Sequence, residues 1–184
     1  MNIQSLKDRT GFGQWLNDAG LMGRGVEVGA DRGDNAREIM RHWQGDHLYL
    51  VDFWATQDPN VYKEDQALFF DYEMSYRHCL ALALVYAPRI DLIRALSLKA
   101  VNLFDDNSLD FVYIDANHSY EEAIFDMAAW YPKVRRGGVI SGHDYYNKVE
   151  PPWHCEVKKA VDEFFTISKP HITEPCRSWW VIKT

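Results

Sequence analysis

The apolar residues of this chain follow two spacings, one typical of buried strands and one typical of amphipathic helices. Short apolar runs predict five strands, and two further runs near the end of the chain predict a closing pair. These predicted strands cover residues 26–30, 48–52, 90–95, 110–115, 137–144, 171–175 and 178–183. Between them, apolar residues recur every three or four positions, as on one face of a helix. Strands that alternate with helices predict an α/β domain, in which helices cover both faces of a mostly parallel sheet.

The helical stripes are bounded by residues that start or stop helices. The stripes consist of Phe12, Trp15, Leu16 and Ala19, then Ala36, Ile39, Met40 and Trp43, and finally Val157, Ala160, Val161 and Phe164. Gly20 and Gly45 follow the first two stripes and predict their ends. A longer helix is expected over residues 65–86. The pair Ser119 and Glu122 forms a capping-box pattern, which predicts the start of another helix.

Four of the predicted strands end in glycine or polar residues. Residues 29–31 (Gly-Ala-Asp) close the first strand, and Asp52 ends the second. Asp115 ends the fourth strand, and residues 143–144 (His-Asp) end the fifth. Ligands of open α/β sheets lie beyond the carboxyl ends of the strands. The sequence therefore predicts a binding site at this edge of the sheet.

The turn after the first strand, "GVEVGADRGDNA", has the outline of a nucleotide-binding loop but a different spacing. Glu27, Gly29 and Gly33 replace the Gly-x-Gly-x-x-Gly pattern of a dinucleotide site. Asp52 stands where such folds place the acid that accepts hydrogen bonds from ribose hydroxyls. Glu27 and Asp31 would repel a pyrophosphate, because like charges at short range repel. A ribose-bearing ligand that has no phosphate and carries positive charge fits better, and S-adenosylmethionine has these features.

The alternative is that Glu27, Gly29 and Gly33 form only a tight strand-to-helix turn. We expect Gly29→Val to fold but to lose the methyl donor, because a side chain there would meet the ligand or the turn. Nearby aromatic residues leave several interpretations open as well: Phe53, like its neighbour Trp54, suits a wall for adenine, the core or a lid. Ser97 suits either the edge of adenine or a helix N-cap.

Composition limits the classes of partner. The chain has 184 residues, is 47% hydrophobic and carries a formal net charge of −7. The negative charge argues against nucleic acid and against an anionic membrane surface. The polar start "MNIQSLKDRT" predicts no signal peptide, and the apolar run over residues 79–87 is too short to span a membrane. Three widely spaced cysteines predict neither a zinc site nor a disulfide framework. We expect a single domain over residues 1–184, located in the cytoplasm.

The chain resembles the class I S-adenosylmethionine-dependent methyltransferases. The resemblance rests on "VEVGADRGDNA", "LVDFW", "DFVYIDANHSYEEAIFD", "WYPKVRRGGVISGHDYY", "VKKAVDEFF" and "SWWVIK". It implies a Rossmann-like three-layer sandwich whose seven-stranded sheet has the order 3-2-1-4-5-7-6, with an antiparallel last strand at residues 178–183. The expected donor-binding residues are Glu27, Gly29, Ala30, Asp31, Gly33, Asp52, Phe53, Ser97 and Asp115.

A second cluster concerns the methyl acceptor. The branch that the chain resembles includes O-methyltransferases of sugars and other hydroxylated metabolites. Some of these hold a divalent metal through an acid after strand four and an acidic pair after strand five, and use a histidine three residues after the first acid as general base. Here the metal positions are Asp115, His143 and Asp144, and the catalytic residues are His118, Asp115 and His143.

His143 departs from that pattern, because Mg²⁺ prefers oxygen ligands to imidazole. Three alternatives follow. The metal ion is softer than Mg²⁺, or Asp115 and Asp144 hold the ion without His143, or no metal binds.

The sequence therefore predicts O-methylation of a small-molecule substrate by S-adenosylmethionine, with a divalent metal such as Mg²⁺ or Mn²⁺ as an assisting ion. Residues 145–156 carry aromatic residues and two prolines, and suit either a stiff lid over the acceptor or a surface loop. Two other functions stay open, an NAD-type dehydrogenase and a catalytically inactive module that keeps the methyltransferase fold. No nucleic acid or membrane partner is expected, and a homo-oligomer stays open.

Overall fold

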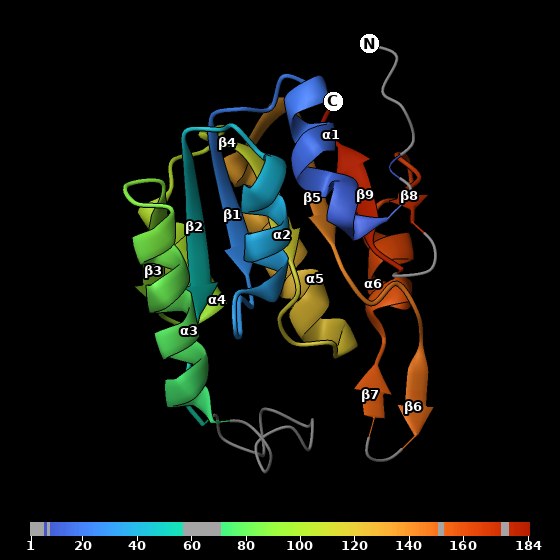
Figure 1. The fold of residues 1–184 in the computed structure, drawn as a ribbon. Coiled ribbons are helices and arrows are strands. Elements are labelled where there is room, and N and C mark those ends of the chain that lie inside the picture. The colour runs from blue at the N-terminus through green and yellow to red at the C-terminus, as the bar shows by residue number, and fades with distance from the viewer. Residues whose placement is uncertain (1–5, 7, 57–70, 151–152, 174–176) are drawn as a thin grey trace.

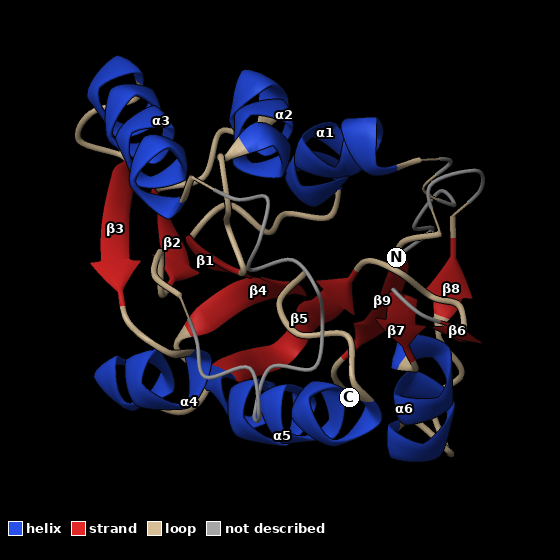
Figure 2. Ribbon diagram, turned by 90° about the horizontal axis from the view of Figure 1, so that it is seen from below, coloured by secondary structure: helices blue, strands red, loops and turns tan. Residues whose placement is uncertain are grey.

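A computed structural model describes residues 6, 8–56, 71–150, 153–173 and 177–184. A seven-stranded sheet lies between two layers of helices, as Figures 1 and 2 show. One layer consists of α1 (Phe12–Asp18), α2 (Asp34–His42) and α3 (Tyr72–Val85). The other consists of α4 (Ser97–Ala100), α5 (Tyr120–Trp130) and α6 (Val157–Phe164). Short 3-10 helices precede α1 (Arg9–Gly11), follow α4 (Val101–Leu103) and follow α5 (Tyr131–Lys133).

The strand order of the main sheet confirms the predicted topology. Its strands are β1 (Arg24–Val28), β2 (His47–Asp52), β3 (Ile90–Arg94), β4 (Leu109–Ile114), β5 (Val134–Gly142), β8 (His171–Ile172) and β9 (Trp179–Ile182). They lie in the order β3-β2-β1-β4-β5-β9-β8. The first five are parallel, and β9 is antiparallel to both β5 and β8. The order equals 3-2-1-4-5-7-6 once the separate hairpin of β6 and β7 is left out of the count.

Alternate residues of the central strands pack into two cores, one on each face of the sheet. In β4, Phe111 and Tyr113 belong to the core under α1, α2 and α3. Val112 and Ile114 belong to the core under α4, α5 and α6. Because a parallel sheet is covered on both faces, its central strands are apolar at successive positions rather than at alternate ones. The two packed cores therefore hold the carboxyl ends of these strands in fixed positions.

Two predicted helix boundaries need correction, and one predicted N-cap lacks its capping hydrogen bond. The helix expected over residues 65–86 begins at Tyr72. The carboxylate of Asp71 caps this helix by accepting a hydrogen bond from the backbone N–H of Met74 (2.9 Å). Residues 65–70 lie outside the described residues. The helix α2 ends at His42, three residues before Gly45, since the backbone of Trp43 is extended. Ser119 does occupy the N-cap of α5, but its side chain makes no capping hydrogen bond.

Residues 145–156 include an antiparallel hairpin, which the sequence did not predict. Its strands are β6 (Lys148–Glu150) and β7 (Trp153–Cys155). The hairpin joins β5 to α6, as Figure 1 shows. Just after β7, the backbone N–H of Glu156 donates to the carbonyl of His118 (2.8 Å). This bond ties the base of the hairpin to the turn before α5.

Within the described part of the chain, no helix has the length and the apolar character needed to cross a membrane.

Candidate functional site

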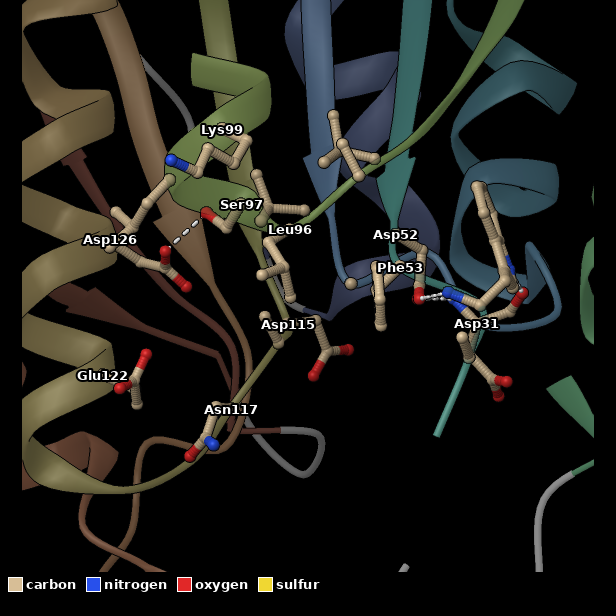
Figure 3. A pocket seen from close by; sticks show the side chains of 18 of the residues that line it. Asp31, Asp52, Phe53, Leu96, Ser97, Lys99, Asp115, Asn117, Glu122 and Asp126 are labelled. Carbon is tan, nitrogen blue, oxygen red and sulfur yellow. Dashed lines mark hydrogen bonds between the residues drawn. The ribbon is translucent and has the colours of Figure 1, made fainter. Parts of the chain in front are cut away.

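A cavity of about 620 Å³ opens at the carboxyl ends of the parallel strands. Six of the predicted donor-binding residues line it: Gly29, Asp31, Asp52, Phe53, Ser97 and Asp115. His118, the predicted general base, lines the same cavity. Figure 3 shows Asp52 on one side, Ser97 and Asp126 on the other side, and Asp115 between them. The volume lies in the range of about 300–1,000 Å³ that is typical of small-molecule pockets.

The glycine turn after β1 brings two strand ends into contact. Gly29 has a φ of +85°, and an ideal Cβ on it would lie 2.0 Å from the carbonyl oxygen of Asp115. The backbone N–H of Asp115 in turn donates to the carbonyl of Val28 (2.8 Å). Only glycine allows this approach, so Gly29 sets the distance between the turns that follow β1 and β4.

Three predicted donor-binding residues lie behind the cavity wall rather than on it. Ala30 is buried, and Gly33 faces Cys79 and Leu82 of α3. Gly33 has a φ of +76° at the N-cap of α2, so its role is to let the chain enter the helix. Glu27, the third of these residues, lies within β1 rather than in the turn after it.

Glu27 is a buried carboxyl group next to this turn. The residue is 2% exposed, and its Oε1 accepts a hydrogen bond from Nδ2 of Asn35 (3.0 Å). Its Oε2 has no hydrogen-bond partner among the described residues. Burial raises the pKa of Glu27 to about 8, against the lowering effect of Asn35, and the charge of Asp115 adds to the rise. A buried carboxyl with an unsatisfied oxygen is costly on its own, and it suits a ligand that brings a cationic group.

Asp52 is held rigidly at the end of β2. Its Oδ2 accepts from the backbone N–H of Asp31 and its Oδ1 from that of Trp54, both at 2.8 Å. Burial raises the pKa of Asp52 although these hydrogen bonds lower it. Each carboxylate oxygen keeps a further lone pair, which suits it to accept from the hydroxyls of a ribose. Phe53 and Trp54 both line the cavity. Trp54 is also buried in the core and braces the turn, with its Nε1 donating to the carbonyl of Asp31 (2.7 Å).

Two histidines and two acids meet beyond β4 and β5. His118 Nε2 lies 2.9 Å from Oδ2 of Asp144 and 3.6 Å from Oδ1 of Asp115. His143 Nδ1 lies 3.1 Å from Oδ1 of Asp144 and 4.0 Å from Oδ1 of Asp115. All four side chains are largely buried, so their charges interact more strongly than they would in water.

The partners of these groups shift their pKa values in opposite directions. Burial opposes ionisation of Asp144, but the hydrogen bonds from His118 and His143 hold its pKa well below the usual range. Burial also lowers the pKa of His143, yet the hydrogen bond with Asp144 and the charge of Asp115 outweigh it, so the pKa is raised. Asp144 is therefore ionised at neutral pH, and His143 holds its proton more strongly than a histidine in water does.

The ligand atoms that fit one metal ion differ from the predicted set. Among the described residues, Asp115, His118 and Asp144 offer one ligand atom each within 4.8 Å of one another. We predicted Asp115, His143 and Asp144. His118 takes the place of His143 because it faces both carboxylates from the turn before α5, whereas His143 pairs mainly with its chain neighbour. The same nitrogen of His118 cannot bind a metal and a proton at once.

Sequence reasoning missed two charged residues of the site. The positive charge of Arg9 acts on both Glu27 and His143, where it opposes the rise in pKa without reversing it. No local pattern could have placed Arg9 there, since it comes from the turn before α1. Asp126 lies on the cavity wall and is 4% exposed. It could have been found, because it follows Ala123 by three residues and precedes Trp130 by four, on the buried face of α5.

Comparison with known proteins decides the family. The family model described as a methyltransferase domain matches residues 26–145, which include both the glycine turn and the acid–histidine cluster. The chain belongs to this methyltransferase family. The match favours the methyltransferase interpretation of the cavity over the dehydrogenase.

Individual relatives of this methyltransferase domain are distant. It is 26% identical over 137 residues to the uncharacterized protein y4gI of Sinorhizobium fredii (strain NBRC 101917 / NGR234); the match covers 72% of the chain but only 14% of that protein. The structure of the O-methyltransferase NovP matches with a TM-score of 0.66 and 18% identity, over 96% of this chain and 78% of NovP. Spermidine synthase from Thermotoga maritima matches with a TM-score of 0.57 and 18% identity, over 96% of this chain and 60% of the synthase. At such identities the likeness concerns the fold, which carries different activities.

Proposed function

We propose that this methyltransferase domain transfers a methyl group from S-adenosylmethionine to a hydroxyl oxygen of a small molecule. The observation that carries the proposal is the single cavity that Asp52 and His118 share. Asp52 and two members of the acid–histidine cluster, Asp115 and His118, thus face the same space. S-adenosylmethionine, when bound, supplies a methyl group on a positively charged sulfur.

The residues of the chain fit the donor in chemical type. Asp52 would accept hydrogen bonds from the ribose hydroxyls, in addition to those that it already accepts from the backbone. Asp31 would place negative charge near the cationic end of the donor. Glu27, whose pKa burial raises to about 8, would lose its proton as the cationic donor binds, and its unsatisfied Oε2 is consistent with that role. The turn at Gly29 would let the backbone come close to the ligand.

The acid–histidine cluster would prepare the acceptor. A hydroxyl must lose its proton as its oxygen attacks the methyl group, and a positioned histidine can take that proton. His118 and His143 are the candidate proton acceptors, and Asp144 orients both. Asp115, His118 and Asp144 would hold a divalent ion, which lowers the pKa of a bound hydroxyl. Two carboxylates and one imidazole suit Mn²⁺ better than Mg²⁺.

The donor assignment is tested by isothermal titration calorimetry. We expect S-adenosylmethionine and S-adenosylhomocysteine to bind the purified protein with measurable heat, and NAD to give none, because the acids near the glycine turn repel a pyrophosphate. Binding of NAD together with no heat from either sulfur ligand would overturn the proposal and restore the dehydrogenase interpretation.

Replacing Asp52 by alanine is expected to weaken the binding of S-adenosylhomocysteine by about 1–3 kcal/mol, a roughly 5- to 150-fold rise in Kd. The ribose hydroxyls would lose their acceptor, and the backbone N–H groups of Asp31 and Trp54 would lose theirs. The matched control is Asp106→Ala. Asp106 is an exposed acid that pairs with Lys133 and precedes β4, at the opposite end of the strands. An unchanged Kd in Asp52→Ala, with the melting temperature preserved, would exclude Asp52 from the donor site.

A further inference from the structure

Trp179 is a buried tryptophan whose indole N–H has no hydrogen-bond partner within the described part of the chain. It is the first residue of β9 and is 1% exposed. The residue opposite it on β5 is Gly142, which directly precedes His143. An ideal Cβ on Gly142 would lie 2.8 Å from Cζ2 and 2.9 Å from Cε2 of Trp179. Because Cε2 is bonded to Nε1, the polar edge of the indole lies over the end of β5.

A small inner cavity lies beside this indole. Its volume is about 10 Å³, and four residues with polar side-chain atoms line it: Asn117, His118, His143 and Trp179. The rest of its wall is apolar and comes from β4, α5 and α6. A cavity of this size holds about one water molecule when two or more polar groups face it. A buried N–H without an acceptor costs free energy, and a water in this cavity would remove that cost.

The two candidate proton acceptors border different spaces. His118 lines both the donor cavity and the inner cavity, whereas His143 lines the inner cavity and not the donor cavity. Nδ1 of His143 lies 3.1 Å from Oδ1 of Asp144, and an ionised carboxylate can only accept a hydrogen bond. Nδ1 therefore carries a proton, and Nε2 is the nitrogen of His143 that is left for a partner in the inner cavity.

One water molecule can pair with both Trp179 and His143. It would accept from Nε1 of Trp179, because an indole N–H can only donate. It would also bond to Nε2 of His143 in either protonation state of the ring, because water both donates and accepts. Both nitrogens of His143 would then have partners inside the protein, which leaves neither of them for the hydroxyl of an acceptor.

We propose that Trp179 holds one buried water against His143, and that His143 is thereby a positioning residue for Asp144 and not a proton acceptor. The inference rests on the proposed function, because it assigns a role within the cluster that activates the acceptor. Partners that lie behind an active-site group commonly fix the orientation of that group. Asp144 also lies 2.9 Å from His118, so an Asp144 held in place orients His118 in turn.

The water is tested by NMR spectroscopy of the protein without donor or acceptor. The indole proton of Trp179 is assigned as the signal that disappears in Trp179→Phe. We expect this proton to give a cross-peak with a protein-bound water, measured in the rotating frame so that chemical exchange is distinguished by its sign. Val161→Ile adds one methyl group to the wall of the inner cavity and should remove the cross-peak while the indole signal persists. A wild-type protein without the cross-peak would overturn the proposal.

Trp179→Phe is expected to lower kcat by about 10- to 100-fold, as the loss of a group that orients an active-site residue usually does, with little change in the Kd for S-adenosylhomocysteine. Val161→Ile should lower kcat as well, because it displaces the water and keeps Trp179. The matched control is Trp43→Phe. Trp43 is also 1% exposed, but its Nε1 donates to the carbonyl of Leu21 (2.7 Å) in the core on the other face of the sheet. It should keep the wild-type kcat, and a wild-type kcat in Trp179→Phe would contradict the proposal.

His143→Asn separates positioning from proton transfer. The NH₂ group of an asparagine can still donate to Asp144, but the amide cannot take up the proton of an acceptor. We therefore expect His143→Asn to keep a kcat well above that of His143→Ala. An equal loss in the two variants, of about 10²- to 10⁴-fold, is the result expected of a general base and would overturn the positioning role.

The outcomes separate this inference from the proposed function. Absence of the water cross-peak in a protein that binds S-adenosylhomocysteine would overturn the role of Trp179 and leave the donor assignment in place. Failure of the wild-type protein to bind S-adenosylhomocysteine would instead contradict the donor assignment, whatever the NMR spectra show.

Discussion

Replacing Gly29 by alanine is expected to abolish measurable binding of S-adenosylhomocysteine and to lower the free energy of unfolding by about 2–5 kcal/mol. About 1–2 kcal/mol comes from the left-handed backbone at φ +85°. A further 1–3 kcal/mol, roughly, comes from overpacking, because the added Cβ would lie 2.0 Å from the carbonyl oxygen of Asp115. From the sequence alone we predicted that Gly29→Val would fold and lose only the donor. The structure changes that expectation, since the new side chain meets the backbone after β4.

The matched control for this variant is Gly20→Ala. Gly20 has a similar φ of +71°, but an added Cβ would have no atom within 4 Å. It should therefore lose only the backbone contribution and keep its affinity for the donor. Thermal denaturation and calorimetry measure the two effects separately. If Gly29→Ala has the same melting temperature and the same Kd for S-adenosylhomocysteine as Gly20→Ala, the turns after β1 and β4 are not in close contact. That result would contradict the proposed role of Gly29 in the donor site.

Replacing His118 by alanine is expected to lower kcat by about 10²- to 10⁴-fold, the usual contribution of a general acid or base, with little change in the affinity for S-adenosylhomocysteine. His118 lies 2.9 Å from Asp144 and 3.6 Å from Asp115, so its loss removes a candidate proton acceptor and a candidate metal ligand together. The control is His42→Ala, an exposed residue at the end of α2. A fall of less than tenfold would exclude His118 as the main activator of the acceptor.

Chelation separates the two roles of His118. With a metal in the group of Asp115, His118 and Asp144, EDTA abolishes turnover without affecting donor binding, and added Mn²⁺ restores it. We expect this outcome, because three ligand atoms lie within 4.8 Å of one another. If the protein is fully active in EDTA and His118→Ala still loses activity, the proposed metal site is wrong and His118 acts as a proton acceptor. Because the acceptor is unknown, a screen of metabolite extracts with a labelled donor precedes these assays.

The features that could be predicted from the sequence are those encoded by local patterns. The apolar runs gave the main strands, because a parallel sheet buries both faces of each strand. The strand order and the antiparallel end came from the resemblance to the methyltransferases and are confirmed. The rule that ligands lie at the carboxyl ends of strands correctly brought Asp52, Asp115 and His118 to one cavity.

The remaining features depend on contacts that no local pattern encodes. The hairpin of β6 and β7 escaped prediction because all three residues of β6 are exposed, so no alternation of apolar and polar residues marks it. The choice between His118 and His143 as the partner of both acids depends on side-chain directions beyond β4 and β5. The approach of Arg9 depends on how the segment before α1 lies over the sheet.

The hairpin of β6 and β7 has a consequence for how this protein family can diversify. It follows the turn after β5, which carries His143 and Asp144, and its base is bonded to the turn that carries His118. The pairing of β5 with β9 continues beneath it without a gap in register. Changes in the strands of the hairpin would therefore leave the turns after β1 and β2 untouched. Evolution can alter the surface beside His118, His143 and Asp144 without altering the turns that carry Gly29 and Asp52.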